Sequence, residues 1–515
     1  MSNKLRMWAA SAVLALGMSQ PVMAAPQGEL KIGLPTLYSN SFLPQATIGF
    51  SIVYQSPVFD FLVATNAAGN FDPSVSIAEK WETSPDGKTW TFQIRQGVKF
   101  HNGDPLTVDD VKFTLDMTVT PKNTAGRRAD FVEFIDKVET SGSDKVIVRL
   151  KKPWSTFLYF LSDLIGVQGM IVPKAYYESK GEENFLRNPV GSGPYRVQES
   201  VEGSHIKLQA LDAHWRVKEP KYRSITFRVL PESGTRVAAL KNHEVDLISV
   251  GLAEYADVKK SGFDIIRKED GALIDLSFMR VNQQANSPLN NPKVREALQI
   301  AINRQEILQQ ILFGEGNQTG TTLALFTWAF DYKPFPSIPY DPAKAKRLLA
   351  EAGYPNGFDI SLYSFVQGLP EMKLVNEAIA AYWELIGMRP KILEMDYSAF
   401  RPVWMKQKEP PGPAAFAMDW PNRPFYSWRG KYHSTAVFGT VSDPKLDEMI
   451  EKAEAENDQA KYSVLSQNIM QYVREQGYSS GISTAHQLFA KDKAVPAWDA
   501  GRSFGSMRIE YIGAK

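Results

Sequence analysis

The chain has 515 residues, too many for a single hydrophobic core, so we expect more than one domain. Its formal charge is only +1, and its 58 basic side chains form no lysine-rich or arginine-rich run, which argues against nucleic-acid binding. The absence of cysteine excludes disulfide bonds and a lipid-bearing cysteine.

The N-terminal residues 1–24 have the three parts of a secretory signal peptide. Lys4 and Arg6 give a charged start, residues 7–18 are apolar, and small residues lead up to Ala24, after which we expect cleavage. The apolar run is too short for a stable membrane anchor, and no later segment reaches about 18 uninterrupted apolar residues. The sequence therefore predicts an exported protein that is free in a bacterial periplasm, without a lipid anchor.

In the following 250 or so residues, short strands are expected to alternate with helices. Residues 30–34 form a strand pattern. Apolar and polar side chains alternate in residues 90–94 and again in 145–150, so each segment is expected to be a strand with one buried face. Thr107, with Asp110 three residues later, forms a capping box that predicts a helix from residue 108.

The second half of the chain carries clearer helix signals. Asp341-Pro342 and Asp443-Pro444 each place an N-cap residue before a proline at the first helical position. Both pairs are followed by apolar residues at helical spacing. The same spacing predicts helices at 292–312 and 373–386, and strand patterns lie at 358–363 and 390–394. This half is therefore predicted to be an α/β domain.

No pattern in the chain matches a catalytic or metal site. None of the six histidines pairs with another at the i,i+4 spacing of a helical metal site. Residues 501–505 fit G-x-S-x-G, but no histidine follows them to complete a triad. The glycines at 314–320 and 87–89 only approach nucleotide-binding motifs, and turns are the better interpretation. We expect no catalytic residue, no metal and no cofactor.

Residues 79–111, EKWETSPDGKTWTFQIRQGVKFHNGDPLTVDDV, resemble the signature region of extracellular solute-binding protein family 5. This family contains the dipeptide- and oligopeptide-binding components of ABC importers. Further segments resemble the family in the same order, at 188–195, 237–247, 291–307 and 340–358, so that the resemblance covers about residues 28–495. Within the signature, the HNGD at 101–104 is interpreted as a turn that His101 orders, rather than as a site.

The resemblance implies an α/β fold, namely a bilobal periplasmic binding protein of type II, similar to cluster C, with an extra subdomain in lobe one. It implies lobe one at 25–57, 168–279 and 484–515, the extra subdomain at 58–167, and lobe two at 280–483. The chain would cross between the lobes near 278–282 and 481–486. Ligand would bind between the lobes, and the closed form would dock on the permease subunits of an importer.

The function implied by the resemblance is capture of a small polar solute, peptide-like, opine-like or otherwise zwitterionic or anionic, for delivery to an ABC importer. A sugar, a metal complex or haem would be alternative cargo of the same fold, and the sequence does not separate import from signalling to a chemoreceptor. A secreted hydrolase and a chaperone-like role are alternatives of other classes, the hydrolase being disfavoured by the missing catalytic residues. We expect a monomer.

In peptide-binding members of the family, an aspartate of lobe two holds the amino group of the peptide, within a pattern such as A-D-Y-x-D-P. Residues 417–424 (AMDWPNRP) correspond to this pattern, so the resemblance implies Asp419 as the ligand anchor. The second acid of the pattern is missing, and Arg423 stands beside its position, which would suit a carboxylate or phosphate on the ligand.

Other side chains are candidates for the walls of the ligand site. Aromatic rings give affinity through burial, and the resemblance implies that the loop after the first strand faces the cleft. These candidates are Trp420, Tyr426, Trp428, Arg429, Trp328 and, in the loop after the first strand, Tyr38, Ser39 and Asn40. The structural alternative for the segment around Asp419 is a surface loop with a capping aspartate and packed tryptophans.

Overall fold

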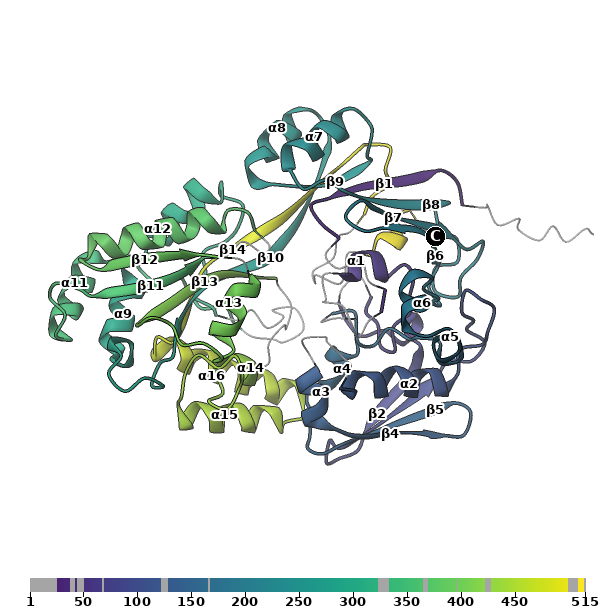
Figure 1. Cartoon of the computed structure of the whole chain (residues 1–515), viewed down its shortest axis with the longest axis horizontal. Coiled ribbons are helices and arrows are strands. Elements are labelled where there is room, and N and C mark those ends of the chain that lie inside the picture. The colour runs from purple at the N-terminus through teal and green to yellow at the C-terminus, as the bar shows by residue number, and fades with distance from the viewer. Residues whose placement is uncertain are drawn as a thin grey trace, which may run out of the picture.

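The computed structural model describes residues 26–37, 42–43, 51–66, 69–121, 128–164, 167–322, 333–364, 369–395, 397–421, 428–498 and 508–513. Within them the chain forms two β-sheets with helices packed around them (Figure 1). The larger sheet has the order β12 (Arg389–Glu394), β11 (Asp359–Ser364), β13 (Ala414–Pro421), β10 (Asp264–Met279), β14 (Ser479–Lys491), β9 (Leu247–Val250), β1 (Glu29–Leu34), β8 (Ser224–Val229), β7 (His205–Ala210) and β6 (Tyr195–Val201). The smaller sheet has the order β2 (Ala78–Thr83), β3 (Thr89–Ile94), β5 (Lys145–Leu150) and β4 (Ile135–Ser141).

The helices fall into two groups along the chain. The first group is α1 (Ile52–Gln55), η3 (Pro73–Val75), α2 (Val108–Val119), α3 (Arg128–Phe134), α4 (Phe157–Phe160), α5 (Lys174–Lys180), α6 (Glu182–Arg187), α7 (Ser233–Lys241), η4 (Leu252–Glu254) and α8 (Tyr255–Lys260), with η8 (Ile509–Tyr511) near the C-terminus. The second group is η5 (Pro288–Asn290), α9 (Pro292–Ile300), α10 (Arg304–Glu306), η6 (Ile307–Ile311), α11 (Pro342–Glu351), α12 (Met372–Leu385), α13 (Tyr397–Trp404), α14 (Trp428–Tyr432), α15 (Pro444–Glu454) and α16 (Gln459–Glu475). We call the part with β11–β13 and the second group lobe two, and the part with β1, β6–β9, the smaller sheet and the first group lobe one.

The two long strands β10 and β14 run through both lobes (Figure 1). They pair with each other antiparallel, β10 also pairs with β13 in lobe two, and β14 pairs with β9 in lobe one. The pairing of β10 with β14 loses its register between Lys268 and Ala272. There, a Cβ added to Gly271 would lie 2.7 Å from Cβ of Gln487, so the close approach of the two backbones requires glycine. We infer that this irregular stretch lies where the sheet passes from one lobe to the other.

The local signals of the first half are confirmed. In β3 the alternating residues Trp90, Phe92 and Ile94 are buried against the core of the smaller sheet. The helix expected after Thr107 is α2, and its capping box forms as predicted, with the Asp110 carboxylate accepting from the Thr107 backbone N–H at 2.8 Å. These features depend on residues a few positions apart, which is why the sequence alone could predict them.

His101 orders a turn, as expected from the sequence. Its Nε2 donates to the carbonyl oxygen of Gly193 at 2.9 Å, and its Nδ1 accepts from the N–H of Gly191 at 3.3 Å. This tautomer follows from the roles of the two backbone groups, since one accepts and the other donates. Loss of solvent around the ring lowers the pKa of His101 to about 4. The neutral ring therefore joins the turn to residues 191–193, which precede β6.

We expect stability to depend on pH through His101. The ring stays neutral in the folded protein down to about pH 4 but takes up a proton near pH 6.5 when unfolded, so the unfolded state binds more protons in this window. Stability should fall by about 1–2 kcal/mol between pH 7 and pH 5 from this residue. Urea unfolding of His101→Gln at both pH values should lack this part of the change. The exposed His243, substituted in the same way, should retain it, and equal pH dependence in all three proteins would contradict the assignment.

The helices of the second half begin where the sequence predicts them. Asp341 and Asp443 are the N-cap residues of α11 and α15, with proline at the first helical positions. The helix predicted at 292–312 is instead divided, because α9 ends at Ile300 and Asn303 caps a new helix that continues as a π-helix. Asn303 offers its side-chain oxygen to the Glu306 N–H, a typical device for starting a helix.

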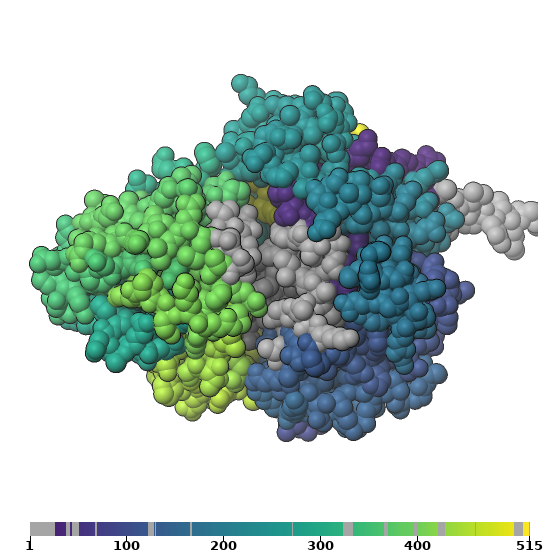
Figure 2. Space-filling model, in the orientation of Figure 1, coloured from purple at the N-terminus to yellow at the C-terminus, as the bar shows by residue number. Residues whose placement is uncertain are grey.

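The two lobes also touch at a second place, away from β10 and β14. Arg429 of α14 lies 3.9 Å from Glu133 of α3, and a Cβ on Gly87 would collide with Asn457 in the connection between α15 and α16. Figure 1 shows α3 beside α15, and Figure 2 shows the surfaces of these parts in contact. The lobes are therefore joined by two strands and are in contact at a site remote from them.

Candidate functional site

Asp419 lies near the C-terminal end of β13, beside the N-terminus of α12. Strand β13 runs parallel to β11, so the C-terminal ends of both strands lie at one edge of the sheet. From the connection between β11 and α12, the backbone N–H of Leu369 donates to Asp419 Oδ2 at 3.0 Å. Glu371 is the N-cap residue of α12 in the same connection. Ligands of open α/β sheets bind at such strand ends, which makes this edge the candidate site.

The environment of Asp419 disfavours a negative charge. Burial raises the pKa of Asp419 to about 6, against the lowering effect of the Leu369 N–H, and the charge of Glu371 raises it further. Burial also raises the pKa of Glu371. Among the described residues, no basic side chain contributes to either shift. Two partly desolvated carboxyl groups without a cation are suited to bind a positively charged group.

Trp420, the next residue on β13, faces a buried polar cluster within the protein. Its side chain is 5% exposed, and its Nε1 donates to Asp275 Oδ1 of β10 at 2.5 Å. Asp275 also pairs with Lys431 of α14, with 2.5 Å between Oδ2 and Nζ and both side chains fully buried. Thr322, Tyr432 and Ser479 complete the cluster through hydroxyl hydrogen bonds. These contacts give Trp420 a structural role, and its contact with ligand stays a prediction.

Trp428 and Arg429 also have partners within the protein. Trp428 is 2% exposed and donates from Nε1 to Ser466 Oγ at 3.2 Å. Arg429 forms close ion pairs with Glu454, at 2.8 Å from Nη2, and lies 3.9 Å from Glu133 of lobe one. Their structural roles are thus defined, whereas their predicted contact with ligand is untested.

The remaining predicted site residues lie outside the described residues. They are Tyr38, Ser39, Asn40, Trp328, Arg423 and Tyr426. Two described residues lie close to them in sequence, Thr322 before Trp328 and Trp420 before Arg423, and both belong to the cluster around Asp275.

Glu371 is the residue of this edge that the sequence analysis missed. The signal was present, since a strand was predicted at 358–363 and a helix at 373–386, and Glu371 stands between them. In α/β sheets, the connection from a strand to the following helix contributes side chains to the ligand site. A carboxyl group in this connection was therefore a candidate on position alone.

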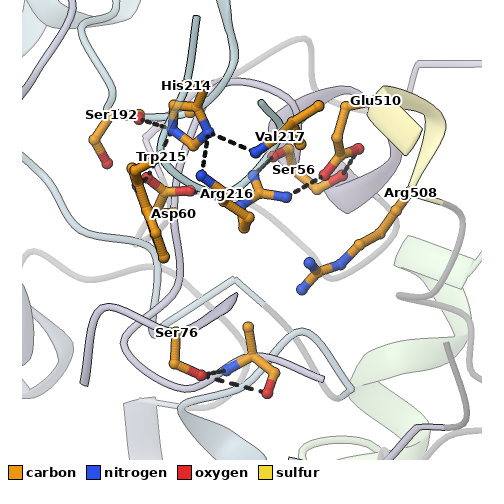
Figure 3. A network of polar contacts seen from close by, with 12 residues as sticks. Ser56, Asp60, Ser76, Ser192, His214, Trp215, Arg216, Val217, Arg508 and Glu510 are labelled. Atoms are coloured by element: carbon orange, nitrogen blue, oxygen red, sulfur yellow. Dashed lines mark hydrogen bonds and ion pairs between the residues drawn. The ribbon is translucent and has the colours of Figure 1, made fainter. Parts of the chain in front are cut away.

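A second polar network lies in lobe one and has a structural role (Figure 3). Asp60 accepts from Nε1 of Trp215 and from Nε of Arg216, both at 2.9 Å, and lies 3.3 Å from His214. Burial raises the pKa of Asp60, but the neighbouring His214 and Arg216 lower it more, so the net pKa is well below its ordinary value. Arg216 also pairs with Glu510 at 3.0 Å. The network attaches the C-terminal η8 to lobe one.

The described residues contain neither a cluster suited to a metal ion nor a helix suited to cross a membrane. No group of three histidine, aspartate or glutamate side chains in the described part of the chain is arranged to hold a metal ion. In the same residues, no helix combines the length and the apolar character needed to cross a membrane.

Comparison with known proteins identifies the class. Residues 72–437 match the model of the bacterial extracellular solute-binding proteins, family 5, and the chain therefore belongs to this family. The predicted family is confirmed. The chain is similar to the glutathione-binding protein GsiB of Salmonella typhimurium (strain LT2), with 33% identity over 62% of this chain and 60% of that protein. It is also similar to the dipeptide-binding protein of Escherichia coli (strain K12), with 28% identity over 76% of this chain and 77% of that protein.

The fold is shared with periplasmic binding proteins of known structure. The binding protein AgaA of A. tumefaciens R10, solved with agropinic acid, superposes with a TM-score of 0.77, at 24% identity, over 94% of this chain and 97% of AgaA. This likeness confirms the predicted fold, an α/β bilobal periplasmic binding protein. The chain spans 60% of the length of the Salmonella relative that it matches.

Proposed function

We propose that this protein is a periplasmic solute-binding protein that captures a small polar solute between its lobes and delivers it to an ABC importer. The cargo is peptide-like, opine-like or another zwitterionic or anionic compound. The observation that carries this proposal is the half-buried Asp419 carboxyl, which has no basic partner among the described residues and lies at a strand edge of the kind where α/β sheets bind ligands. A sugar, a metal complex or haem remains the alternative cargo.

The proposed domain boundaries follow the family resemblance. Lobe one comprises 25–57, 168–279 and 484–515 with the subdomain at 58–167, and lobe two comprises 280–483. The boundaries near 279 and 484 fall within or at the end of β10 and β14, the two strands that both lobes share. A ligand that contacts both lobes would bind the closed form more tightly and would shift the population toward it.

We propose that the protein binds its solute without converting it chemically. Family 5 consists of solute-binding proteins, and the sequence offers no triad or helical metal motif. The signal sequence predicted at 1–24 supports export to the periplasm, where the mature protein would act as a monomer on importer permease subunits. A secreted hydrolase would instead require product formation from the bound solute, which provides a direct way to separate the two functions.

The experiment that tests the proposal is identification of the natural cargo. The protein is purified from its native periplasm without refolding, denatured, and the released small molecules are identified by mass spectrometry. We expect one stoichiometric polar solute that binds the refolded protein again, unchanged after incubation. Recovery of a chemically altered solute would favour the hydrolase, and failure of all recovered solutes to rebind would overturn the transport function.

A further inference from the structure

Glu371 has one carboxyl oxygen that finds no hydrogen-bond partner in the described fold. It occupies the N-cap position of α12, yet it makes no side-chain capping hydrogen bond. It is only 8% exposed, and its Oε2 is buried without a hydrogen-bond partner. A buried carboxyl oxygen without a partner costs stability, because it has lost its water and gained nothing in return. The positive end of the 14-residue α12 reduces this cost but does not supply a hydrogen bond to Oε2.

The surroundings of Glu371 connect both lobes. Its charge acts on Asp419 of β13, and the charge of Glu254 in η4 of lobe one acts on Glu371. The backbone of Leu252, also in η4, favours the charged form of the Glu371 carboxyl. Glu254 in turn accepts a hydrogen bond from the Ser233 hydroxyl at 2.8 Å. The charge of a lobe-one carboxyl therefore acts on Glu371, which stands two residues after the Leu369 whose N–H holds Asp419.

We propose that Glu371 is a second specificity-determining carboxylate, which receives, together with Asp419, a protonated amine of the cargo. This inference rests on the proposed solute-binding function and adds the chemical class of the group that is recognised. An ammonium group has three N–H donors, so it satisfies the free oxygen of Glu371 and an oxygen of Asp419 at once. It also relieves the repulsion between the two carboxyl groups, which a neutral or anionic group would not do.

The arrangement makes amine binding compete with protons. In the ligand-free protein the two carboxyl groups retain protons to higher pH than usual, because burial disfavours the charge of both, the charge of Glu371 adds to this effect at Asp419, and the charge of Glu254 adds to it at Glu371. An ammonium group favours the ionised carboxylates, so its binding releases protons near pH 6. Affinity for an amine should therefore rise between pH 5 and pH 7, whereas affinity for a ligand without the amine should not.

The first test needs no ligand. Protein stripped of cargo by unfolding and refolding is compared with Glu371→Gln by thermal unfolding at pH 7.5. If Glu371 is an uncompensated carboxylate, the variant should melt about 1–3 °C higher. Glu377→Gln, an exposed position on the same helix, should melt as the wild type does. An unchanged or lower melting temperature for Glu371→Gln would mean that the protein itself satisfies this group, and would overturn the proposal.

The second test uses calorimetry with alanyl-alanine and N-acetyl-alanyl-alanine. The free amine should bind at least about tenfold more tightly than the acetylated form, and Glu371→Gln should lose most of this difference. Titrations at pH 6 in phosphate and imidazole buffers should show proton release by the wild type and less by the variant. Equal affinity for both probes would overturn the inference. Binding of neither probe would instead exclude a dipeptide cargo, and the thermal comparison would then decide the state of Glu371.

Discussion

Lys431→Met is expected to lower the free energy of unfolding by about 3–5 kcal/mol. Lys431 and Asp275 are both fully buried, and their charged atoms lie 2.5 Å apart. Burial lowers the pKa of Lys431, but the charge of Asp275, the neighbouring Tyr432 and the hydrogen bonds to both together raise it more, so the net shift favours the charged amine. Methionine has a similar volume and removes the positive charge, which leaves Asp275 as a buried carboxylate without a charge partner, although Trp420 and Thr322 still donate hydrogen bonds to it. The cost therefore comes from an uncompensated charge rather than from lost packing.

Two further variants, measured by urea unfolding, separate the effect of an uncompensated charge from the effect of lost packing. The double variant Asp275→Leu with Lys431→Met should recover part of the loss, because no buried charge remains. Lys293→Met removes one partner of an exposed ion pair with Glu351 and should cost less than about 0.5 kcal/mol. A loss below about 1 kcal/mol for Lys431→Met would contradict the assignment of a buried ion pair.

Asp419→Ala is expected to weaken cargo binding by about 2–5 kcal/mol. The carboxyl is placed by the Leu369 N–H at the C-terminal edge of β13, and burial raises its pKa to about 6 in the ligand-free protein. A cationic group of the cargo would be its charge partner, so the substitution removes a desolvated ion pair. Calorimetry with the solute recovered from the native protein measures the loss directly.

The control for this prediction is a carboxylate outside the proposed site. Asp359 lies at the other end of β11, where it is exposed and pairs with Arg389, so Asp359→Ala should leave cargo affinity unchanged. A loss below about 0.5 kcal/mol in Asp419→Ala would place Asp419 outside the ligand site. If Asp419→Ala alone abolishes binding while Glu371→Gln has no effect, the anchor holds and the second carboxylate does not.

The contrast between Asp419 and Trp420 shows how far sequence similarity can assign a site. Both residues belong to one segment that resembles the ligand-binding pattern of the family, and both were predicted to contact ligand. Successive side chains of a strand point to opposite faces of the sheet. Trp420 thus reaches Asp275 in the interior, while Asp419 reaches the connection between β11 and α12. Proximity in sequence does not imply that two residues share a surface.

The sequence by itself determined the family and the local elements. The segments between residues 79 and 358 that resemble family 5 in the same order identified the family. The capping residues Thr107, Asp341 and Asp443 located the starts of three helices. These signals are carried by residues within a few positions of one another, because capping bonds and the periodicity of burial are local properties of the backbone.

Only the tertiary structure decided which charged groups have partners. Asp275 and Lys431 are 156 positions apart, and Arg429 meets Glu454 within its lobe and Glu133 across the lobes. The sequence placed Glu371 between a strand and a helix. It did not show that Oε2 of Glu371 is buried without a hydrogen bond. The energy of a charge depends on its burial and on the neighbours that packing brings to it, and neither quantity is encoded in a local pattern.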